Sequence, residues 1–344
     1  MKIFAIHNNT GSRFYRLIPQ LKDLQKHGHK VILEKHDDPY ALQHIEWADV
    51  VILQMVLSPE YIAHAKKHGK KVIFECDDLI HIVPKTHYEY KNTQGIKNRL
   101  KWWHRLYTTI SKCDGFIGTN EKLVNKYGWM AKKSLVFHNY CDLPHWLKEK
   151  KDNTSDTIRL LWAGSTSHTG DLQMIKPVLK RILDKYKNVK FVYIGTGGIK
   201  SKDLNAKFIY GKDIFEGLPD SREMLLPMTA NLYPYTLAGL LADIAIAPLE
   251  NNYFNSFKST CKYLEYSVNK IPGVYSGWFY KTAVRDGVNG FTADTEDEWV
   301  EKLSRLIESK DLRDEIVQSA YDDVVNEQNI DKNLHSWREF IETI

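Results

Sequence analysis

The chain has 344 residues, of which 43% are hydrophobic and 26% charged, a balance that excludes a disordered or collagen-like protein. Its longest apolar runs, such as Val50–Leu53, are far shorter than the roughly 20 residues of a membrane span. Four cysteines without a CxxC pair, and an N-terminus without a signal-peptide pattern, predict a cytoplasmic protein with reduced thiols. At roughly 150 residues per domain, this length predicts two domains.

Short apolar segments alternate with amphipathic segments through the first half of the chain. Val50–Leu53 is apolar throughout, which is typical of a parallel strand covered by helices on both faces. The predicted strands are residues 1–7, 29–34, 49–54, 71–76, 115–119 and 134–138. The predicted helices are residues 13–27, 59–68, 96–111 and 121–127.

A second array follows a charged, aperiodic segment, residues 147–157, which we interpret as a linker. The predicted strands are residues 158–162, 189–194, 207–210, 243–247 and 271–276. The predicted helices are residues 172–186, a short one from Glu223, then 258–268, 297–309, 312–325 and about 332–344. The pattern therefore predicts an α/β protein with two Rossmann-like domains, residues 1–150 and 151–326. Two such domains enclose a cleft, and ligands bind beyond the carboxyl ends of the strands.

Charged and hydroxyl side chains follow the strand at residues 243–247. Lys258, Lys262 and Glu265 are spaced i, i+4, i+7, so they share one face of the predicted helix. Ser259 falls in its first turn, where free N–H groups and the helix dipole favour an anion. Two lysines would neutralise a diphosphate, and the carboxylate could accept hydrogen bonds from a ribose diol. The alternative is an ordinary amphipathic helix with surface charges.

The first half offers candidates at two strand ends. Gly11 follows the first strand and precedes Arg13 and Arg16; a glycine permits close backbone approach, and an arginine can bind phosphate with two parallel hydrogen bonds. The alternative is that both arginines lie on a solvated helix face. Asp77 and Asp78 end the fourth strand and could bind the hydroxyls of a sugar or an acceptor. They could equally cap a helix or a turn.

Charge is distributed unevenly along the chain. Residues 1–150 carry 24 Lys and Arg against 15 Asp and Glu, net +9, whereas residues 151–344 carry 24 against 28, net −4. In the helix 96–111 we expect an apolar stripe to be core, comprising Ile96, Leu100, Trp103, Tyr107 and Ile110. Its basic side carries Lys97, Lys101 and Arg105, with Arg99 at the edge. This predicts an anionic partner for the first half, a membrane surface or a nucleic acid, against the alternative of a solvated face.

Two histidines, His64 and His68, are spaced i, i+4 on a predicted helix. The sequence offers no third ligand beside them, so we expect them to be solvated rather than to bind zinc. The two lysines near the predicted diphosphate site make a divalent cation unnecessary there. We therefore expect no essential metal.

The stretch Asp243–Ser276 resembles the signature region of family 1-type, retaining family 4-like glycosyltransferases of the GT-B fold. The matching positions are Ala242–Leu249, Asn255, Lys258-Ser259, Lys262, Leu264-Glu265-Tyr266 and Ile271–Ser276. Further similarity lies in Val284–Phe291, in Leu160–Ser165 and in the terminal helix that carries Trp337. In the family that helix crosses back, which implies that residues 327–344 pack on the first domain.

The resemblance implies transfer of a sugar, with retention, from a nucleoside-diphosphate sugar to an acceptor hydroxyl in glycan or cell-surface polysaccharide synthesis. It implies a UDP- or GDP-sugar donor, no other cofactor, and a glycan or lipid-linked acceptor, with the enzyme peripheral at the inner face of a membrane. Glu265 would hold the ribose, and Lys258, Ser259 and Lys262 the diphosphate. Gly164 and Ser165 would let backbone approach the phosphates, and His168 would donate to a phosphate.

Two departures from the family pattern leave alternatives open. Phe257 stands where relatives have a second glutamate that contacts the donor sugar, and the loop Gly164–His168 lacks their Arg/Lys pair. One alternative is a nucleotide-sugar epimerase or an inactive nucleotide-sugar-binding protein of the same fold. The other, which the basic first half would suit, is a glycosyltransferase acting on modified DNA bases.

Overall fold

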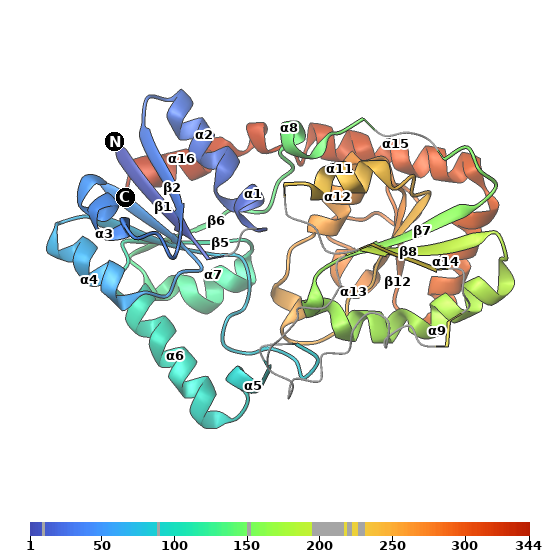
Figure 1. Ribbon diagram of the computed structural model, residues 1–344, viewed down its shortest axis with the longest axis horizontal. Helices are drawn as coiled ribbons and strands as arrows, with labels where there is room; N and C mark the ends of the chain where they lie inside the picture. The colour runs from blue at the N-terminus through green and yellow to red at the C-terminus, as the bar shows by residue number, and fades with distance from the viewer. Residues whose placement is uncertain (9–10, 88–89, 150–152, 195–216, 219–221, 226–230) are drawn as a thin grey trace.

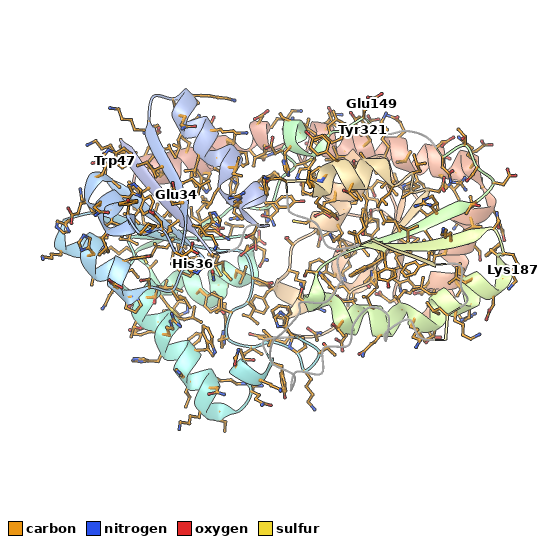
Figure 2. The ribbon with its side chains drawn as sticks, viewed as in Figure 1. Glu34, His36, Trp47, Glu149, Lys187 and Tyr321 are labelled. Atoms are coloured by element: carbon orange, nitrogen blue, oxygen red, sulfur yellow. The ribbon has the colours of Figure 1, made fainter. Side chains whose placement is uncertain are left out.

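Two six-stranded parallel sheets, each placed between helices, form the two halves of the molecule (Figure 1). This computed structural model describes residues 1–8, 11–87, 90–149, 153–194, 217–218, 222–225 and 231–344. Trp47 and Lys187 mark the opposite outer ends of the molecule (Figure 2). The predicted fold, two Rossmann-like α/β domains facing each other, is confirmed.

The first sheet has the strand order β2-β1-β3-β4-β5-β6. Its strands are β1 (Lys2–His7), β2 (Lys30–Lys35), β3 (Val50–Gln54), β4 (Lys71–Cys76), β5 (Gly115–Gly118) and β6 (Lys133–Val136). All six were expected from the apolar runs. Its helices are α1 (Arg13–Arg16), α2 (Ile18–Lys26), α3 (Ala41–Trp47), α4 (Pro59–Lys67), α5 (Tyr90–Thr93), α6 (Ile96–Ile110), α7 (Glu121–Tyr127) and α8 (Leu143–Trp146).

The predicted helix 13–27 is interrupted at Leu17, between α1 and α2. Pro19 lies in the first turn of α2 and has no N–H to donate to the carbonyl of Tyr15. The side chain of Gln20 donates to that carbonyl instead, at 2.6 Å. Because of this break, α1 and α2 are separate helices. Tyr15 of α1 lies at the interface between the halves.

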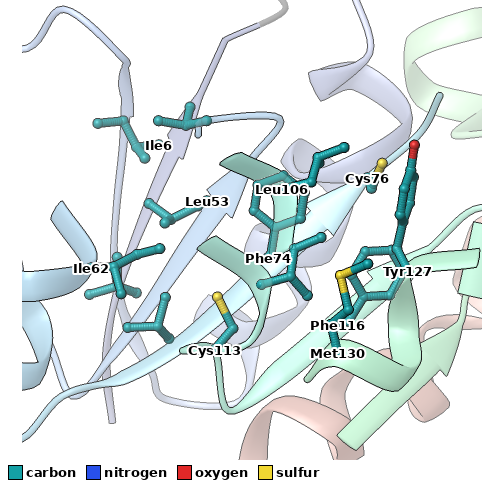
Figure 3. Close-up of a cluster of buried hydrophobic side chains, with 14 of the residues drawn as sticks. Ile6, Leu53, Ile62, Phe74, Cys76, Leu106, Cys113, Phe116, Tyr127 and Met130 are labelled. Atoms are coloured by element: carbon teal, nitrogen blue, oxygen red, sulfur yellow. The ribbon is translucent and has the colours of Figure 1, made fainter. Parts of the chain in front are cut away.

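Apolar side chains fill the space between the first sheet and helices α4, α6 and α7 (Figure 3). Phe74 and Phe116 on neighbouring strands pack with Ile62, Leu106 and Tyr127, all fully buried. Burying one such side chain contributes roughly 1.5–3 kcal/mol. This core fixes the ends of β4 and β5. Asp77 and Asp78 follow β4 directly and begin the next loop.

The second sheet has the order β12-β11-β10-β7-β8-β9, which is the Rossmann order. Its strands are β7 (Ile158–Ala163), β8 (Val189–Ile194), β9 (Arg222–Leu225), β10 (Ile244–Ala247), β11 (Gly273–Ser276) and β12 (Phe291–Ala293). Its helices, and the last helix of the chain, are α9 (Thr169–Lys185), α11 (Tyr233–Gly239), α12 (Cys261–Val268), α13 (Gly277–Tyr280), α14 (Glu296–Glu308), α15 (Lys310–Asn326) and α16 (Leu334–Glu342). Short 3₁₀ turns cover Gly128–Met130, Thr166–His168, Asn255–Phe257 and Ile330–Lys332.

The helix predicted from Glu223 is wrong, because Arg222–Leu225 is strand β9, paired in parallel with β8. Pairing with a neighbouring strand overrides the weak local preference of so short a segment. The predicted strand 207–210 lies outside the described residues. The short strand β12 was not predicted from the sequence.

The end of the chain returns to the first half, as expected, and α16 lies beside α2 (Figure 1). Trp337 and Ile341 are buried in the cluster that also holds Ile3 and Ala5 of β1. Arg338 adds an ion pair to Asp23 of α2, at 2.5 Å. The second half is therefore tied to the first by both the linker and the C-terminal helix.

The predicted core stripe of α6 is wrong at three of its five residues, because Ile96, Leu100 and Tyr107 are 79%, 62% and 46% exposed. The prediction holds for Ile110, which is fully buried, and for Trp103, which is partly buried against the core of the first half. The first part of α6 extends beyond the sheet, so only its C-terminal part has a core to cover (Figure 1). Helical periodicity identified the residues that share a face, but that face is exposed at Ile96 and Leu100 and buried at Ile110.

None of the helices in the described part of the chain is long and apolar enough to cross a membrane. The four cysteines are free thiols, and Cys76, Cys113 and Cys141 are buried.

Candidate functional site

A cavity of about 510 Å³ lies between the two halves, at the carboxyl ends of both sheets. Each sheet reverses its strand order at this edge, between β1 and β3 and between β7 and β10, which is where open α/β sheets bind ligands. Ten residues predicted from the sequence line the cavity: Gly11, Asp77, Asp78, Gly164, Ser165, His168, Lys258, Ser259, Lys262 and Glu265.

The Glu265 carboxylate, on α12, is the centre of a hydrogen-bond cluster. Tyr15 of the first half donates to Oε1 at 2.9 Å, and Tyr233 of α11 donates to Oε2 at 2.9 Å. Lys262 Nζ lies 2.7 Å from the same Oε2. Burial and the neighbouring carboxylate raise the pKa of both tyrosines, which therefore stay neutral donors. The carboxylate is paired with protein donors, although the sequence suggested one assigned to a ribose.

Lys258 and Ser259 precede α12, which begins at Cys261. Lys258 has extended backbone, so Lys258, Lys262 and Glu265 do not share one helical face; that expectation is wrong, although all three reach the same cavity. The Lys258 ammonium lies 5.1 Å from the centre of the Phe254 ring. Ser259 Oγ accepts a hydrogen bond from Asn139 Nδ2, at 2.8 Å, across the interface between the halves.

The two predicted phosphate-binding arginines do not line the cavity. Arg16 is fully buried and pairs with Glu75 at 2.5 Å, so it lies neither on a solvated face nor in the predicted site. Its Nη1 also donates to Asn139 Oδ1, at 3.0 Å. Arg13 Nη1 lies 3.3 Å from His7 Nε2. Arg16 therefore reaches the site indirectly, by orienting the Asn139 amide that holds Ser259.

Asp77 and Asp78 follow β4 and line the first-half wall of the cavity. Burial raises the pKa of Asp78 to about 6, and the nearby Lys258 ammonium opposes the rise. Burial also raises the pKa of Asp77, against the charge of Arg16. Asp78 Oδ1 accepts the N–H of Leu79 at 3.0 Å, so this aspartate both caps its turn and faces the cavity.

The loop after β7 brings Gly164, Ser165 and His168 to the opposite wall. A Cβ at Gly164 would lie 2.5 Å from the Trp162 ring, so the indole requires this glycine, and its N–H already donates to Ile194 at 3.1 Å. His168 Nδ1 lies 2.6 Å from Asp171 Oδ2.

The protonation of His168 follows from its surroundings. A carboxylate only accepts, so the Asp171 contact places the proton of His168 on Nδ1. Burial and Lys258 lower the pKa of the imidazole, which leaves Nε2 of the neutral ring as an acceptor. The geometry thus favours acceptance from a hydroxyl over the predicted donation to a phosphate.

An aromatic wall was missed by the sequence reasoning. The rings of Tyr15 and Tyr233 lie 5.3 and 5.7 Å from that of Trp146, and all three line the cavity. These residues come from three distant segments, with no motif to mark them. Phe257 is buried in the core of the first half and takes no part in the lining.

Comparison with known proteins finds similarity in structure alone. No protein-family model matches the chain, and no curated protein sequence does. HepE of Anabaena, in a complex with UDP and glucose, matches with a TM-score of 0.65 at 12% identity over 100% of both chains. A glycosyltransferase from Rickettsia africae matches with 0.65 at 15% identity, over 98% of this chain and 97% of its own.

Two further solved structures extend the comparison. TarM matches with a TM-score of 0.60 at 14% identity, over 87% of this chain and 57% of its own. The UDP-GlcNAc 2-epimerase of Neisseria meningitidis matches with 0.54 at 14% identity, over 100% of both chains. At such identities the similarity establishes a shared fold: this chain has the two-domain GT-B fold of glycosyltransferases.

Proposed function

We propose that the chain is a glycosyltransferase that moves a sugar from a nucleoside-diphosphate sugar to an acceptor hydroxyl. One observation carries the proposal: a single cavity places the cations Lys258 and Lys262 and the carboxylate of Glu265 opposite Asp77 and Asp78. Complexes of HepE with UDP and with UDP-glucose, in the same fold, support a nucleotide-sugar ligand. A UDP- or GDP-sugar is the donor class we propose.

The second half would bind the nucleotide. Glu265 accepts hydrogen bonds from the ribose diol, in place of those it now receives from Tyr15 and Tyr233. Lys258, Lys262 and Ser259 hold the diphosphate. Negative charge grows on the leaving phosphate as the glycosyl bond breaks, and fixed cations there stabilise the transition state. The lysines supply this charge without a divalent cation, and the leaving phosphate accepts the acceptor's proton, with retention of configuration.

The first half would face the transferred sugar and the acceptor. Asp77 and Asp78 of this half, together with the neutral His168 on the opposite wall, offer hydrogen-bond acceptors that suit sugar hydroxyls rather than phosphates. Gly11 brings backbone close to the same space. Arg16 would not contact the ligand but orients Asn139, which in turn holds Ser259. Arg13 contacts His7.

The acceptor class follows from α6. Lys97, Arg99, Lys101 and Arg105 are exposed on this helix, which contains no acidic residue. Exposed Ile96 and Leu100 lie among them. Apolar side chains bordered by cations favour the surface of an anionic membrane over a nucleic acid. We propose that α6 docks on such a surface and that the acceptor is a lipid-linked molecule or glycan presented there; a structure of a TarM mutant contains α-GlcNAc-glycerol and UDP.

A panel of nucleotides tests the donor assignment. Thermal shift with UDP, GDP, ADP and their sugars should raise the Tm for one nucleoside, since a ligand at 100 times its Kd stabilises by about 2.7 kcal/mol. No shift with any of them would contradict the proposal.

Product analysis separates transfer from epimerisation, an activity that the same fold hosts in the Neisseria enzyme. A transferase releases nucleoside diphosphate only with acceptor present, or hydrolyses the donor slowly. An epimerase returns an altered nucleotide-sugar without acceptor, and an inactive binding protein returns the donor unchanged.

A further inference from the structure

We propose that Glu46, His64 and His68 bind one divalent transition-metal ion of the Zn²⁺ class on the outer side of the first half. Glu46 lies near the end of α3, His64 lies on α4, and His68 follows α4 directly. None of the three lines the cavity. Figure 2 labels the neighbouring Trp47 at the outer edge of this half.

The distances between ligand atoms fit a single ion. Glu46 Oε1 lies 2.9 Å from His64 Nε2 and 3.8 Å from His68 Nε2. One ligand atom from each residue lies within 4.8 Å of the other two. Zinc bonds of about 2.1 Å at a tetrahedral angle place two ligand atoms about 3.4 Å apart. The two measured distances bracket that value, so small side-chain rotations suffice.

The ring of His68 is already oriented for metal binding. Its Nδ1 lies 3.0 Å from the carbonyl oxygen of His64. Because a carbonyl only accepts, Nδ1 carries the proton and the lone pair lies on Nε2, the nitrogen that faces Glu46. A hydrogen bond of this kind from the second ring nitrogen to a carbonyl is the usual support of a metal-bound histidine.

The site is accessible, and it is distinct from ordinary surface pairs. The side chains of Glu46, His64 and His68 are 51%, 21% and 33% exposed, so an ion can enter and keep water as a fourth ligand. Within the described part of the chain, no other group of three His, Cys, Asp or Glu side chains converges in this way. Pairs such as His335 and Glu339 offer two ligands and no third.

The ion would join two helices that flank β3. Glu46 is 18 residues before His64, too far for a spacing rule, and only the packing of α3 on α4 supplies it as the third ligand. Such a bridge stabilises the first half without touching the nucleotide site. Its expected signature is therefore a rise in the Tm on adding metal, independent of donor or acceptor.

Calorimetric titration of the full chain with ZnCl₂ tests the site. We expect wild type to bind one more Zn²⁺ than His64→Gln, His68→Gln or Glu46→Gln, or to bind it at least about tenfold more tightly. His335→Gln, which removes an exposed histidine elsewhere, should behave as wild type. Circular dichroism establishes that each variant is folded, and three single variants guard against one failing to fold.

Thermal unfolding gives a second readout. Zinc should raise the Tm of wild type and His335→Gln, and this rise should be lost in the three site variants. Equal zinc affinity and equal Tm shifts in all five proteins would overturn the proposal, as would the absence of zinc binding by wild type. Neither readout depends on catalytic activity. Failure of the zinc proposal therefore leaves the proposed function untouched, and failure of the proposed function leaves the zinc proposal untouched.

Discussion

At the scale of single residues, Glu265 connects the two halves and the proposed donor. Its two carboxylate oxygens accept hydrogen bonds from Tyr15, Tyr233 and Lys262. A ribose diol presents two further donors of the same kind. Exchange of tyrosine hydroxyls for ribose hydroxyls would preserve the number of hydrogen bonds that the carboxylate accepts, while the displaced Tyr15 and Tyr233 hydroxyls would need other acceptors.

Glu265→Gln should weaken nucleotide binding about 10- to 100-fold, because hydrogen bonds to a charged group contribute roughly 1.5–3 kcal/mol. The amide keeps the size of the side chain, so folding should be retained with a modest fall in Tm as Lys262 loses its partner. Calorimetry with UDP and GDP measures the effect, and Glu308→Gln on the outer surface is the control. Unchanged affinity would remove Glu265 from the donor site.

The pKa of Asp78, raised to about 6 by burial, gives a pH dependence. As an acceptor for sugar hydroxyls the carboxylate acts when ionised, and its ionised fraction falls tenfold per pH unit below 6. We expect kcat/KM to rise with pH through about 6 and to level off above it. In Asp78→Asn that rise should be absent and the remaining activity flat. A wild-type profile that falls through pH 6 would assign the protonated form instead.

At the scale of elements, the sequence predicted strands better than it predicted their surroundings. The inner strand β3 is apolar from Val50 to Leu53 and buried throughout, so burial on both faces could be recognised from composition alone, whereas the outer strands β2 and β6 are only partly buried. The stripe of α6 shows the limit: periodicity placed Ile96 and Leu100 on one face, but no element in the described part of the chain buries them. Which face is covered depends on tertiary packing, which a single sequence does not encode locally.

The residues of the candidate site also fall into those that local sequence predicts and those that depend on tertiary packing. Residues directly after a strand, such as Asp77 and Gly164, could be placed because all parallel strands end at one edge. Tyr15, Trp146 and Tyr233 converge from separate helices, and no spacing relates them. The role of Arg16 was misjudged because a charged residue buried in an ion pair with Glu75 has the same sequence signature as an exposed one.

The exposed face of α6 should bind anionic vesicles. Replacing Lys97, Arg99 and Lys101 with Ser should reduce binding to phosphatidylglycerol vesicles several-fold and raise the KM for a membrane-borne acceptor. Both effects should be strongest at low salt, because screening acts over about 8 Å at 0.15 M. Ile96→Ser with Leu100→Ser should lower binding without changing its salt dependence. Donor affinity should stay constant in both variants.

A matched variant controls for total charge. Lys22, Lys26 and Lys30 are exposed in the same half, on and next to α2, and their replacement with Ser removes equal charge away from α6. If both triple variants lose vesicle binding equally, the effect is one of net charge and α6 is merely solvated. Binding to duplex DNA in preference to vesicles would assign α6 to nucleic acid.

At the scale of the whole molecule, hydrogen bonds from three parts of the first half reach the second. Tyr15 reaches Glu265, Asn139 reaches Ser259, and Asn120 Nδ2 donates to the Phe257 carbonyl at 2.8 Å. Together with α16, they bring the acidic wall and the lysines around one cavity. The proposed reaction would therefore depend on the interface, since each half supplies only part of the polar lining.

Chelation should leave turnover unchanged. Lys258 and Lys262 provide the positive charge at the proposed diphosphate site, and the proposed zinc ligands lie outside the cavity. Turnover with and without EDTA, at equal ionic strength, measures this directly. Loss of turnover in EDTA that magnesium or manganese restores would contradict a lysine-based mechanism.

Release of nucleoside diphosphate from the preferred nucleotide-sugar, in the presence of anionic, acceptor-bearing membranes, shows whether the chain transfers a sugar. Wild type should release nucleoside diphosphate only when acceptor is present. In Lys258→Ala, kcat should fall about 100-fold or more, as when one transition-state donor is removed, with donor affinity changed far less. Donor binding without release, or equal release by wild type and Lys258→Ala, would rule out the proposed glycosyl transfer at this cavity.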